Sequence, residues 1–321
     1  MLVRRDFSRQ PTVLRDANPG TPHAVTIGNF DGVHLGHQAI LAEVTRAAES
    51  GGYASCVVTF EPHPRELFSP HAAPTRLSSL REKCELLFEH GIDRVQVLRF
   101  NRAFANLSAD AFIDQVLVQG LNAKWVMIGD DFCFGAKRGG DLALLQRAGQ
   151  QLGFEVHAMH TVKAGAGDAA MRVSSSAVRE LLSAGDVGRA ARLLNRAYSI
   201  SGRVVHGDKL GRTLGWPTAN VQMRHNRPPL TGIYAVTVEG LGGRPLNGVA
   251  SIGVRPTVTD SGVVKLEVYL FDFDEDIYGR HIRVDFLKKI RDEEKFSDLE
   301  TLKRQIAQDA DEARRYLETL N

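Results

Sequence analysis

The segment VTIGNFDGVHLGH, residues 25–37, decides the fold of the first half of the chain. The apolar run at residues 24–27 predicts a buried strand, and the glycine-rich turn at residues 28–32 predicts that the strand ends there. In an open parallel α/β sheet, ligands bind beyond the carboxyl ends of the strands. Glycines let the backbone approach a ligand closely, and the helix that follows offers N–H groups to an anion. The segment therefore predicts an anion site at a strand end.

Two histidines follow this turn, with Gly36 between them. His34 and His37 are one helical turn apart, so both would project from the same edge of the helix start. Imidazole donors aimed at phosphate oxygens would stabilise the negative charge that grows when a phosphoryl or nucleotidyl group is transferred. Two other interpretations stay open at this point: a metal-binding H-x-x-H pair, and two solvated histidines after an ordinary turn.

The composition is that of a soluble globular protein long enough for two domains. The chain has 321 residues, and its 40 Lys and Arg nearly balance its 38 Asp and Glu, which gives no indication of a nucleic-acid or membrane partner. The three cysteines lack the pairing of a zinc site or a disulfide framework, which favours a reducing compartment. With neither a signal peptide nor an apolar run long enough to span a bilayer, we expect a cytoplasmic protein that binds small molecules and forms at most a weak homo-oligomer.

Through residue 184, strand-like runs alternate with helix-like segments. This order predicts an α/β doubly wound domain, in which helices cover both faces of a parallel sheet. The strand-like runs are residues 24–27, 54–60, 94–98, 125–128 and 154–157. Ser79 with Glu82 forms a capping box before a helix that would end near Gly91.

After residue 198, short β-rich runs separated by glycine and proline predict an antiparallel β-barrel. The runs are residues 198–205, 232–239, 245–251, 263–271 and 281–287. A charged amphipathic helix at residues 298–320 would close the chain. We expect an N-terminal domain at residues 1–184, a linker at residues 185–197 and a C-terminal domain at residues 198–321.

The segment GDDFCFG, residues 129–135, follows another predicted strand. It would therefore line the same crevice as His34. Phe132 and Phe134 would either flank a flat ring there or be core aromatic residues of a turn.

Two more segments of the first half carry candidate contacts. In RVSSSAVR, residues 172–179, the serines can cap the helix that carries Arg179, and Arg172 would add charge to this second anion site. An isolated serine run of this kind is most often only a cap. In TFEPHP, residues 59–64, two prolines stiffen a loop in which His63 would contact a ligand or be solvated.

The second half has one dense stretch, GDKLGRTLGWPTANV, residues 207–221. Its glycines would let the loop wrap phosphates with its N–H groups, and two cations would add charge. Thr218 and Asn220 are alternate residues of an extended strand and would point to one face. A hydroxyl and an amide oxygen are suitable ligands for a magnesium ion that ATP phosphates also hold. On composition alone, a hairpin entrance with polar strand residues is the preferred interpretation.

Several of these motifs resemble known families. GNFDGVHLGH, residues 28–37, is similar to the H-x-G-H signature of the nucleotidyltransferase superfamily, in the form found in the adenylyltransferase module of prokaryotic bifunctional riboflavin kinase/FAD synthetases. GRTLGWPTAN, residues 211–220, resembles the P-T-A-N signature of riboflavin kinases. Further agreement comes from GIYA at residues 232–235, SIGVRPT at 251–257, LEVYLFDFDEDIYG at 266–279 and FLKKIRDEEKF at 286–296. The likeness spans about residues 24–300 and departs from the families at three positions. Glu61 stands where Asp is usual, Cys133 where a basic residue is frequent, and Trp216 where Phe is frequent.

The resemblance implies a Rossmann-like nucleotidyltransferase domain, a riboflavin kinase-like barrel with a terminal helix, and two successive reactions. In the barrel, riboflavin would attack the γ-phosphorus of ATP to give FMN and ADP. In the α/β domain, FMN would attack the α-phosphorus of a second ATP to give FAD and pyrophosphate. Mg²⁺, ATP at two sites, and the flavins riboflavin, FMN and FAD are the implied cofactor, co-substrate and substrates or products.

The resemblance also assigns roles to residues. Charge on the phosphates of the adenylyl transfer would be stabilised by His34, His37, Arg172 and Arg179. Glu267 would be the base of the kinase, facing inward from its strand, with Thr218 and Asn220 holding the metal. Ligand contacts would come from Gly28, Asn29, Phe30, Asp31, Gly32, Gly36, His63, Asp131, Phe132, Phe134, Ser175 and Ser176, and in the second half from Gly207, Lys209, Gly211, Gly215 and Arg291.

Three alternatives stay open. The first is a single-activity enzyme, either an adenylyltransferase or a riboflavin kinase, with the other module inactive. The second is a non-catalytic flavin carrier, which would not need Thr218, Asn220 and Glu267 together. The third is a metal hydrolase built on His34 and His37, which is weakened because no nearby carboxylate pattern completes a ligand set.

Overall fold

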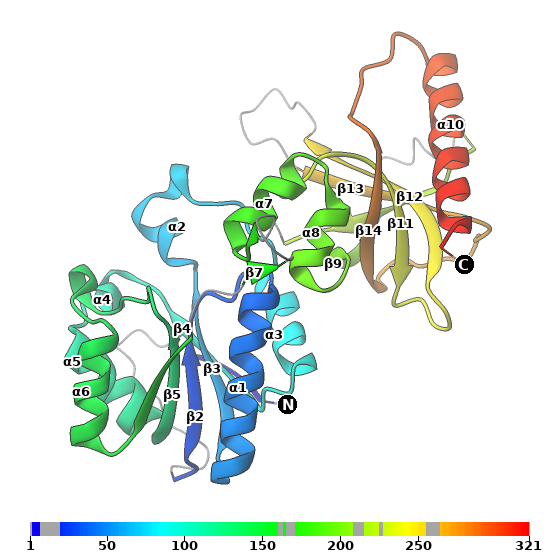
Figure 1. The fold of residues 1–321 in the computed structure, drawn as a ribbon. Coiled ribbons are helices and arrows are strands. Elements are labelled where there is room, and N and C mark those ends of the chain that lie inside the picture. Colours follow the sequence, from blue (N-terminus) through cyan, green and yellow to red (C-terminus); the bar gives the residue numbers. More distant parts are fainter. Residues whose placement is uncertain are drawn as a thin grey trace. The chain divides into compact units, whose positions relative to one another are not determined.

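The structure, a computed structural model, describes residues 2–6, 20–159, 163–164, 171–207, 215–224, 227–254 and 264–320 (Figure 1). The chain divides into two compact units, each described by itself below. Unit 1 consists of Met1–Pro74 and Leu80–Val173, and unit 2 consists of Thr75–Ser79 and Ser174–Asn321. Helices α7 (Ser175–Ser183) and α8 (Val187–Leu194) thus group with unit 2. The boundaries expected at residues 184 and 198 stay predictions.

Unit 1 is built on a six-stranded sheet in the order β1-β4-β3-β2-β5-β6, and every pair of neighbouring strands is parallel. The strands are β1 (Leu2–Asp6), β2 (His23–Ile27), β3 (Ala54–Glu61), β4 (Arg94–Arg99), β5 (Ala123–Gly129) and β6 (Glu155–Met159). The chain adds β3 and β4 on one side of β2, and β5 and β6 on the other. The strand order therefore reverses between β2 and β5, which is where a ligand crevice is expected in such a sheet.

Helices cover both faces of this sheet, as predicted (Figure 1). Alternate strand residues divide between two cores, since Val57 belongs to one and Val58 to the other. The first core includes residues of α1 (Leu35–Gly51) and α3 (Leu80–Glu89), and the second includes residues of α5 (Ala109–Phe112), the π-helical η2 (Ile113–Gly120) and α6 (Leu142–Leu152). The remaining elements are α2 (Pro64–Phe68), η1 (Pro70–Ala72), α4 (Arg102–Ala105), η3 (Ala136–Arg138) and the strand pair β7 (Lys163–Ala164) and β8 (Met171–Arg172).

The edge strand β1 is one element that the sequence pattern did not indicate. It pairs with β4 from Leu2 opposite Arg94 to Asp6 opposite Leu98. Its sequence, LVRRD, contains three charged residues. Charged side chains are common on edge strands, and they hide the apolar alternation by which a strand is recognised.

Unit 2 contains a closed barrel in the order β10-β13-β12-β11-β14-β9, with all neighbouring strands antiparallel. The strands are β9 (Tyr198–Val205), β10 (Thr218–Gln222), β11 (Gly232–Glu239), β12 (Leu246–Val254), β13 (Val264–Leu270) and β14 (His281–Arg291). All five expected strand runs are present, and the extended segment predicted at Thr218 is β10. The predicted antiparallel barrel is confirmed.

Helix α10 (Leu299–Glu318) covers the outer side of the barrel and contacts β11, β12 and β14 (Figure 1). Its apolar residues Ala310, Ala313 and Leu317 join Ile233, Ala235 and Val249 of the barrel in one core. An ion pair adds to this contact, because the Arg291 guanidinium donates to the Asp309 carboxylate at 2.7 Å, with side chains 18% and 6% exposed. The helix is thus held by both apolar packing and a nearly buried charge pair.

We expect Asp309→Ala to lower the free energy of unfolding of unit 2 by about 3 kcal/mol, because the change leaves the Arg291 guanidinium unpaired in a poorly solvated position. Urea denaturation followed by circular dichroism measures this loss. Asp272→Asn is the control, because it removes the charge from an exposed pair with Arg314 while Asn tolerates the left-handed backbone at this position, and it should cause no measurable change. Equal losses in the two variants would contradict the role given to the buried pair.

Candidate active sites

The turn that leaves β2 has a strained backbone. Phe30 (φ 48°) and Val33 (φ 42°) adopt left-handed conformations that residues with side chains rarely take, least of all β-branched ones. Both are buried, at 1% and 0% exposure, so packing holds the turn in this shape. Backbone strain of this kind is common at functional sites, and here the strained turn directly precedes His34 at the start of α1. The other contacts predicted for this turn, Gly28, Asn29, Asp31 and Gly32, lie in it as well.

His34 and His37 stack on each other at the start of α1. Their ring centroids are 3.7 Å apart and their planes differ by 13°. The His37 backbone N–H donates to Nδ1 of His34 at 3.3 Å, so His34 is the N-cap of the helix. Gly36 leaves room for this arrangement, because a β-carbon there would lie 3.2 Å from the His34 ring. The prediction that both imidazoles share one edge of the first turn is confirmed.

His37 is held in its neutral form. Burial lowers the pKa of His37 well below its ordinary value of 6.5, and the charges of His34 and Lys83 lower it further. Nδ1 of His37 and Oδ1 of Asn29 are buried atoms without a hydrogen-bond partner among the described residues. An unpaired buried polar atom costs free energy, so a ligand that hydrogen-bonds to these atoms would gain affinity.

A second group of polar side chains is formed by the loop after β5 and by β8. Nη2 of Arg172 lies 3.4 Å from Oδ2 of Asp131, and both side chains are largely exposed. Because β2 and β5 are parallel neighbours, their following loops lie at the same edge of the sheet. The crevice expected at the strand-order reversal is therefore bordered by the His34 turn and by the loop with Asp131.

Three residues predicted to contact a ligand in unit 1 have structural roles. Phe134 is 6% exposed and packs against Phe112 in the core, with ring centroids 5.4 Å apart. Phe132 stacks on Phe134 at 5.9 Å, an arrangement that favours the core-aromatic interpretation over an open slot for a ligand ring. His63 is the N-cap of α2, where Glu66 completes a capping box. Ligand contacts by Phe132, Phe134 and His63 stay predictions.

Three residues expected at the first site lie on α7, in unit 2: Ser175, Ser176 and Arg179. The predicted helix cap is confirmed, because Ser174 Oγ accepts a backbone hydrogen bond of the first turn at 3.2 Å. Nε of Arg179 donates to the carbonyl oxygen of Thr75 at 2.6 Å, which links α7 to the segment Thr75–Ser79. A part for α7 in the site of His34 stays a prediction.

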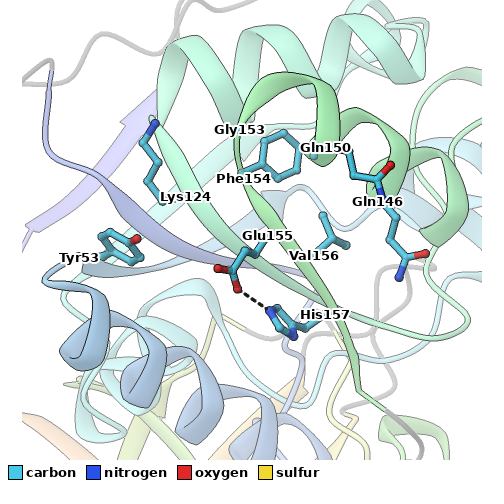
Figure 2. Close-up of a pocket in the computed structure, with 10 residues that line it drawn as sticks. Tyr53, Lys124, Gln146, Gln150, Gly153, Phe154, Glu155, Val156 and His157 are labelled. Atoms are coloured by element: carbon cyan, nitrogen blue, oxygen red, sulfur yellow. Dashed lines mark hydrogen bonds and ion pairs between the residues drawn. The ribbon is translucent and has the colours of Figure 1, made fainter.

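A cavity of about 760 Å³ lies at the other edge of the sheet (Figure 2). Its lining comes from α6, from the starts of β5 and β6, and from the residue before β3. His157 pairs with Glu155 at 3.2 Å and stacks on Trp125 at 4.8 Å, so these groups interact with one another. No residue predicted for a site lines this cavity, which opens at the amino ends of parallel strands, away from the histidine turn.

In unit 2, strand register brings polar residues side by side. Asn220 of β10 lies opposite Glu267 of β13, and Glu267 lies opposite Ser251 of β12. Thr218, two residues before Asn220, is on the same face of the strand. A β-carbon at Gly207 would overlap the Asn220 amide, so only glycine allows that approach. The register therefore gathers Thr218, Asn220 and Glu267 on one surface.

The expectation that Glu267 faces inward is wrong. Leu266, Val268 and Leu270 are buried, with exposures of 1%, 0% and 5%, and fill the barrel. Because side chains alternate along a strand, Glu267 points to the outer face, where it is half-buried. The interior of so small a barrel is filled by apolar side chains and leaves no room for a carboxylate.

Glu293 is a neighbour of Glu267 that sequence reasoning missed. Its carboxyl lies against Gly253 and 3.5 Å from Oγ of Ser251. Partial desolvation raises the pKa of Glu293, and the charge of Glu267 raises it further, while Ser251 and Arg291 lower it. Glu267, the base expected from the sequence, therefore lies beside a second carboxyl group. Glu293 follows Arg291 and Asp292 in a highly charged run, so no periodicity could single it out.

A smaller cavity, of about 270 Å³, opens beside Thr218. Its lining combines apolar and aromatic side chains with three carboxylates: Val204, Val268, Leu270, Phe273, Ile277 and Tyr278, and Asp274, Glu275 and Asp276. A flat uncharged ring suits this lining, whereas the carboxylates would repel a phosphate.

The remaining predicted contacts of unit 2 are less informative. Lys209 and Gly211 lie outside the described residues, and Gly215 lies in the turn before β10. The guanidinium of Arg291 is engaged by Asp309, and its contact with a ligand stays a prediction.

Within the described ranges, no group of three or more His, Cys, Asp or Glu side chains could hold a metal ion. None of the helices in that part of the chain has the length and apolar character needed to cross a membrane.

The lowered pKa of His37 predicts how stability depends on pH. The unfolded chain binds a proton at His37 near pH 6.5 and the folded chain does not, so the stability of unit 1 falls as the pH drops below about 6.5. His37→Gln should reduce this loss between pH 7.5 and 5.5. Urea unfolding followed by Trp125 fluorescence, in a Trp216→Phe background, measures it.

His71→Gln is the control, because His71 is an exposed histidine of unit 1, and it should leave the pH dependence as it is. A pH dependence that is the same in His37→Gln as in the parent would show that His37 is not held neutral.

Comparison with known proteins assigns each half of the chain to a family. Residues 17–177 match the FAD synthetase family, and residues 194–317 match the riboflavin kinase family. A bifunctional riboflavin kinase/FMN adenylyltransferase of Escherichia coli strain K12 is 49% identical over 91% of this chain and 92% of its own length. A protein of the same name from Pseudomonas fluorescens is 50% identical over 90% of this chain and 91% of its own length. The chain belongs to the family of bifunctional riboflavin kinase/FMN adenylyltransferases.

A solved structure supports the fold. The crystal structure named as a macrolide-efflux protein from Streptococcus pneumoniae has a TM-score of 0.75 and 30% sequence identity. The similarity covers 91% of this chain and 94% of that chain. The word efflux in its name describes that protein alone.

Proposed function

We propose that this chain phosphorylates riboflavin to FMN in unit 2 and adenylylates FMN to FAD in unit 1, with one ATP consumed at each site. The observation that carries the proposal is that each unit has its own set of polar groups. Unit 1 has the stacked His34 and His37 at the carboxyl edge of its sheet, and unit 2 has Asn220 opposite Glu267 on its barrel. The matches to both families support this division of the two reactions between the units. So does the name of the relatives, which contains both activities.

In the kinase reaction, the ribityl 5′-hydroxyl of riboflavin attacks the γ-phosphorus of ATP, and the bond to the bridging oxygen of the β-phosphate breaks. Glu267 takes the hydroxyl proton, help that is typically worth about 10²- to 10⁴-fold in rate. The cavity beside Thr218 takes the adenine ring. Because its carboxylates repel phosphate, the triphosphate extends from the cavity toward Thr218 and Asn220.

Mg²⁺ is the proposed cofactor of this step. The Thr218 hydroxyl and the Asn220 amide oxygen are hard neutral donors on one strand face, and Mg²⁺ prefers such oxygen ligands. These two groups would hold the ion weakly alone and firmly together with ATP phosphates, which agrees with a metal that enters with its nucleotide. Bound there, it would neutralise charge on the transferred phosphate.

In the adenylyl transfer, a phosphate oxygen of FMN attacks the α-phosphorus of ATP, and pyrophosphate leaves. Positioning and hydrogen bonding are sufficient for this step, so no covalent intermediate on the protein is required. Neutral His37 carries one ring N–H that donates to a phosphate oxygen, while the N–H groups at the start of α1 bind the same anion. Arg172, on β8, adds positive charge beside Asp131 of the loop after β5.

The setting proposed for these reactions is the cytoplasm, where riboflavin and ATP are both available to a small-molecule enzyme. We propose neither nucleic acid nor membrane as a partner, and no self-association stronger than a weak homo-oligomer. The near balance of 40 basic and 38 acidic residues supports this.

Glu267→Gln should reduce FMN formation from riboflavin at least about 100-fold, because the amide cannot accept the hydroxyl proton. The same variant should make FAD from supplied FMN at the parental rate. Chromatography of flavins and nucleotides, after incubation with ATP and Mg²⁺, measures both reactions. Glu300→Gln, a change at an exposed carboxylate of α10, is the control and should alter neither.

His37→Ala should give the converse result, with FAD formation lost and riboflavin phosphorylation kept. Loss of both activities in either variant would contradict two independent sites. In the parent chain, FMN and ADP without FAD would refute the adenylyltransferase, and unchanged riboflavin would refute the kinase.

A further inference from the structure

Helix α3 carries a buried lysine that none of the steps above uses. Lys83 is 3% exposed, and the other buried residues of this helix are Glu82, Cys84 and Leu87. An ammonium group loses much of its hydration in such a place, and that loss costs free energy. Apolar packing alone therefore does not explain why this position carries a cation.

The ammonium group lies next to the histidine turn. Nζ of Lys83 is 3.5 Å from Oγ1 of Thr59, a fully buried residue near the carboxyl end of β3. The Thr59 hydroxyl in turn donates to the carbonyl oxygen of Asn29 at 3.3 Å, in the turn itself. Lys83 is also close enough to His37 for its charge to lower the pKa of that imidazole. One contact of Lys83, one further hydrogen bond of its partner Thr59 and one electrostatic effect thus connect Lys83 with the histidine turn.

The chemistry of this site calls for a cation. The phosphate of FMN and the triphosphate of ATP are both anionic, and they must approach each other closely for adenylyl transfer. His37 is neutral and contributes a hydrogen bond without a full charge. Arg172 is largely exposed and pairs with Asp131, in a position where solvent weakens its field. A buried ammonium group acts through a lower dielectric and is therefore more effective.

We propose that Lys83 is a further phosphate-binding residue of the adenylyl-transfer site, where its ammonium group contacts an anionic phosphate beside the hydrogen-bond donor His37. The inference rests on the proposed adenylyltransferase function of unit 1. Lys83 forms no covalent bond in the step: it stays protonated while an oxygen of the FMN phosphate bonds to the α-phosphorus and pyrophosphate departs. Its ligand is a phosphate group, which belongs to ATP or to FMN.

Lys83→Met in the full chain tests the proposal. We expect kcat/KM for FAD formation from FMN to fall at least about 100-fold, because a donor aimed at developing charge is removed. Riboflavin phosphorylation should keep its parental rate. Lys83→Arg, which keeps the positive charge, should retain more of this activity than Lys83→Met at an equal melting temperature. A purely structural lysine predicts instead that both variants lose activity only as far as their melting temperatures fall.

Arg81→Met is the matched control on the same helix, since Arg81 is 58% exposed and pairs only locally with Glu85. It should change neither activity. Steady-state kinetics separate the two sources of phosphate: a raised KM for ATP assigns Lys83 to the nucleotide, and a raised KM for FMN assigns it to the flavin phosphate. A Lys83→Met enzyme with parental kcat and both parental KM values would overturn the proposal.

A second measurement uses the parental enzyme and does not depend on whether a Lys83 variant folds. In parental enzyme with isotope-labelled lysine, pyrophosphate or FMN should shift the NMR signals of the Lys83 side chain, and an unchanged signal at saturating ligand counts against the proposal. Failure of the inference is distinguishable from failure of the function. A parental chain that makes no FAD refutes the adenylyltransferase itself, whereas parental FAD synthesis that survives Lys83→Met refutes only the role of Lys83.

Discussion

The proposed adenylyl-transfer site depends on a short turn whose strained backbone is held by packing. Phe30 and Val33 take left-handed conformations while fully buried, so the core of unit 1 stabilises a shape that the chain would not adopt by itself. That shape makes His34 both the cap of α1 and the stacking partner of His37. The strand-order reversal between β2 and β5 then places this turn at the edge where a ligand can enter.

The proposal gives the two units different ways of handling phosphate charge. In unit 1, the neutral imidazole of His37, helix N–H groups and cationic side chains would surround the anion. In unit 2, the residues gathered by strand register are a hydroxyl, an amide and a carboxylate, none of them positive. A site of that composition would need a metal ion that arrives with the nucleotide, whereas the protein itself would supply the compensating charge in unit 1.

Much of this structure could be predicted from sequence because its signals are local. Periodicity located the strands of both units, and the spacing of His34 and His37 was sufficient to place both rings on one helical edge. The signature around Thr218 and Asn220 lies on a single strand, so its face was also predictable. Charges masked the edge strand β1, whose pairing with β4 depends on residues far away in sequence.

The features that were missed or wrongly predicted depend on tertiary packing. Glu267 alternates with apolar residues, and which side of β13 faces the barrel interior is decided only when the barrel closes. Lys83 lies on the same helix face as Leu87, and this spacing indicates that it is buried. Its contact with Thr59 could not be predicted, because the two residues are 24 positions apart in sequence. Phe134 is adjacent in sequence to candidate ligand contacts, yet its side chain packs into the core against Phe112. That contact depends on the tertiary fold and is not visible in the sequence.

The most direct test of the account is to observe the histidine rings while a nucleotide binds. ¹⁵N NMR of histidine-labelled enzyme, titrated with a non-hydrolysable ATP analogue, reports on each ring nitrogen separately. The account predicts that the ring signals of His34 and His37 shift together as the analogue saturates unit 1, and that His37 stays neutral at pH 7. Unshifted rings in an enzyme that still makes FAD would contradict the claim that this turn is where phosphate binds.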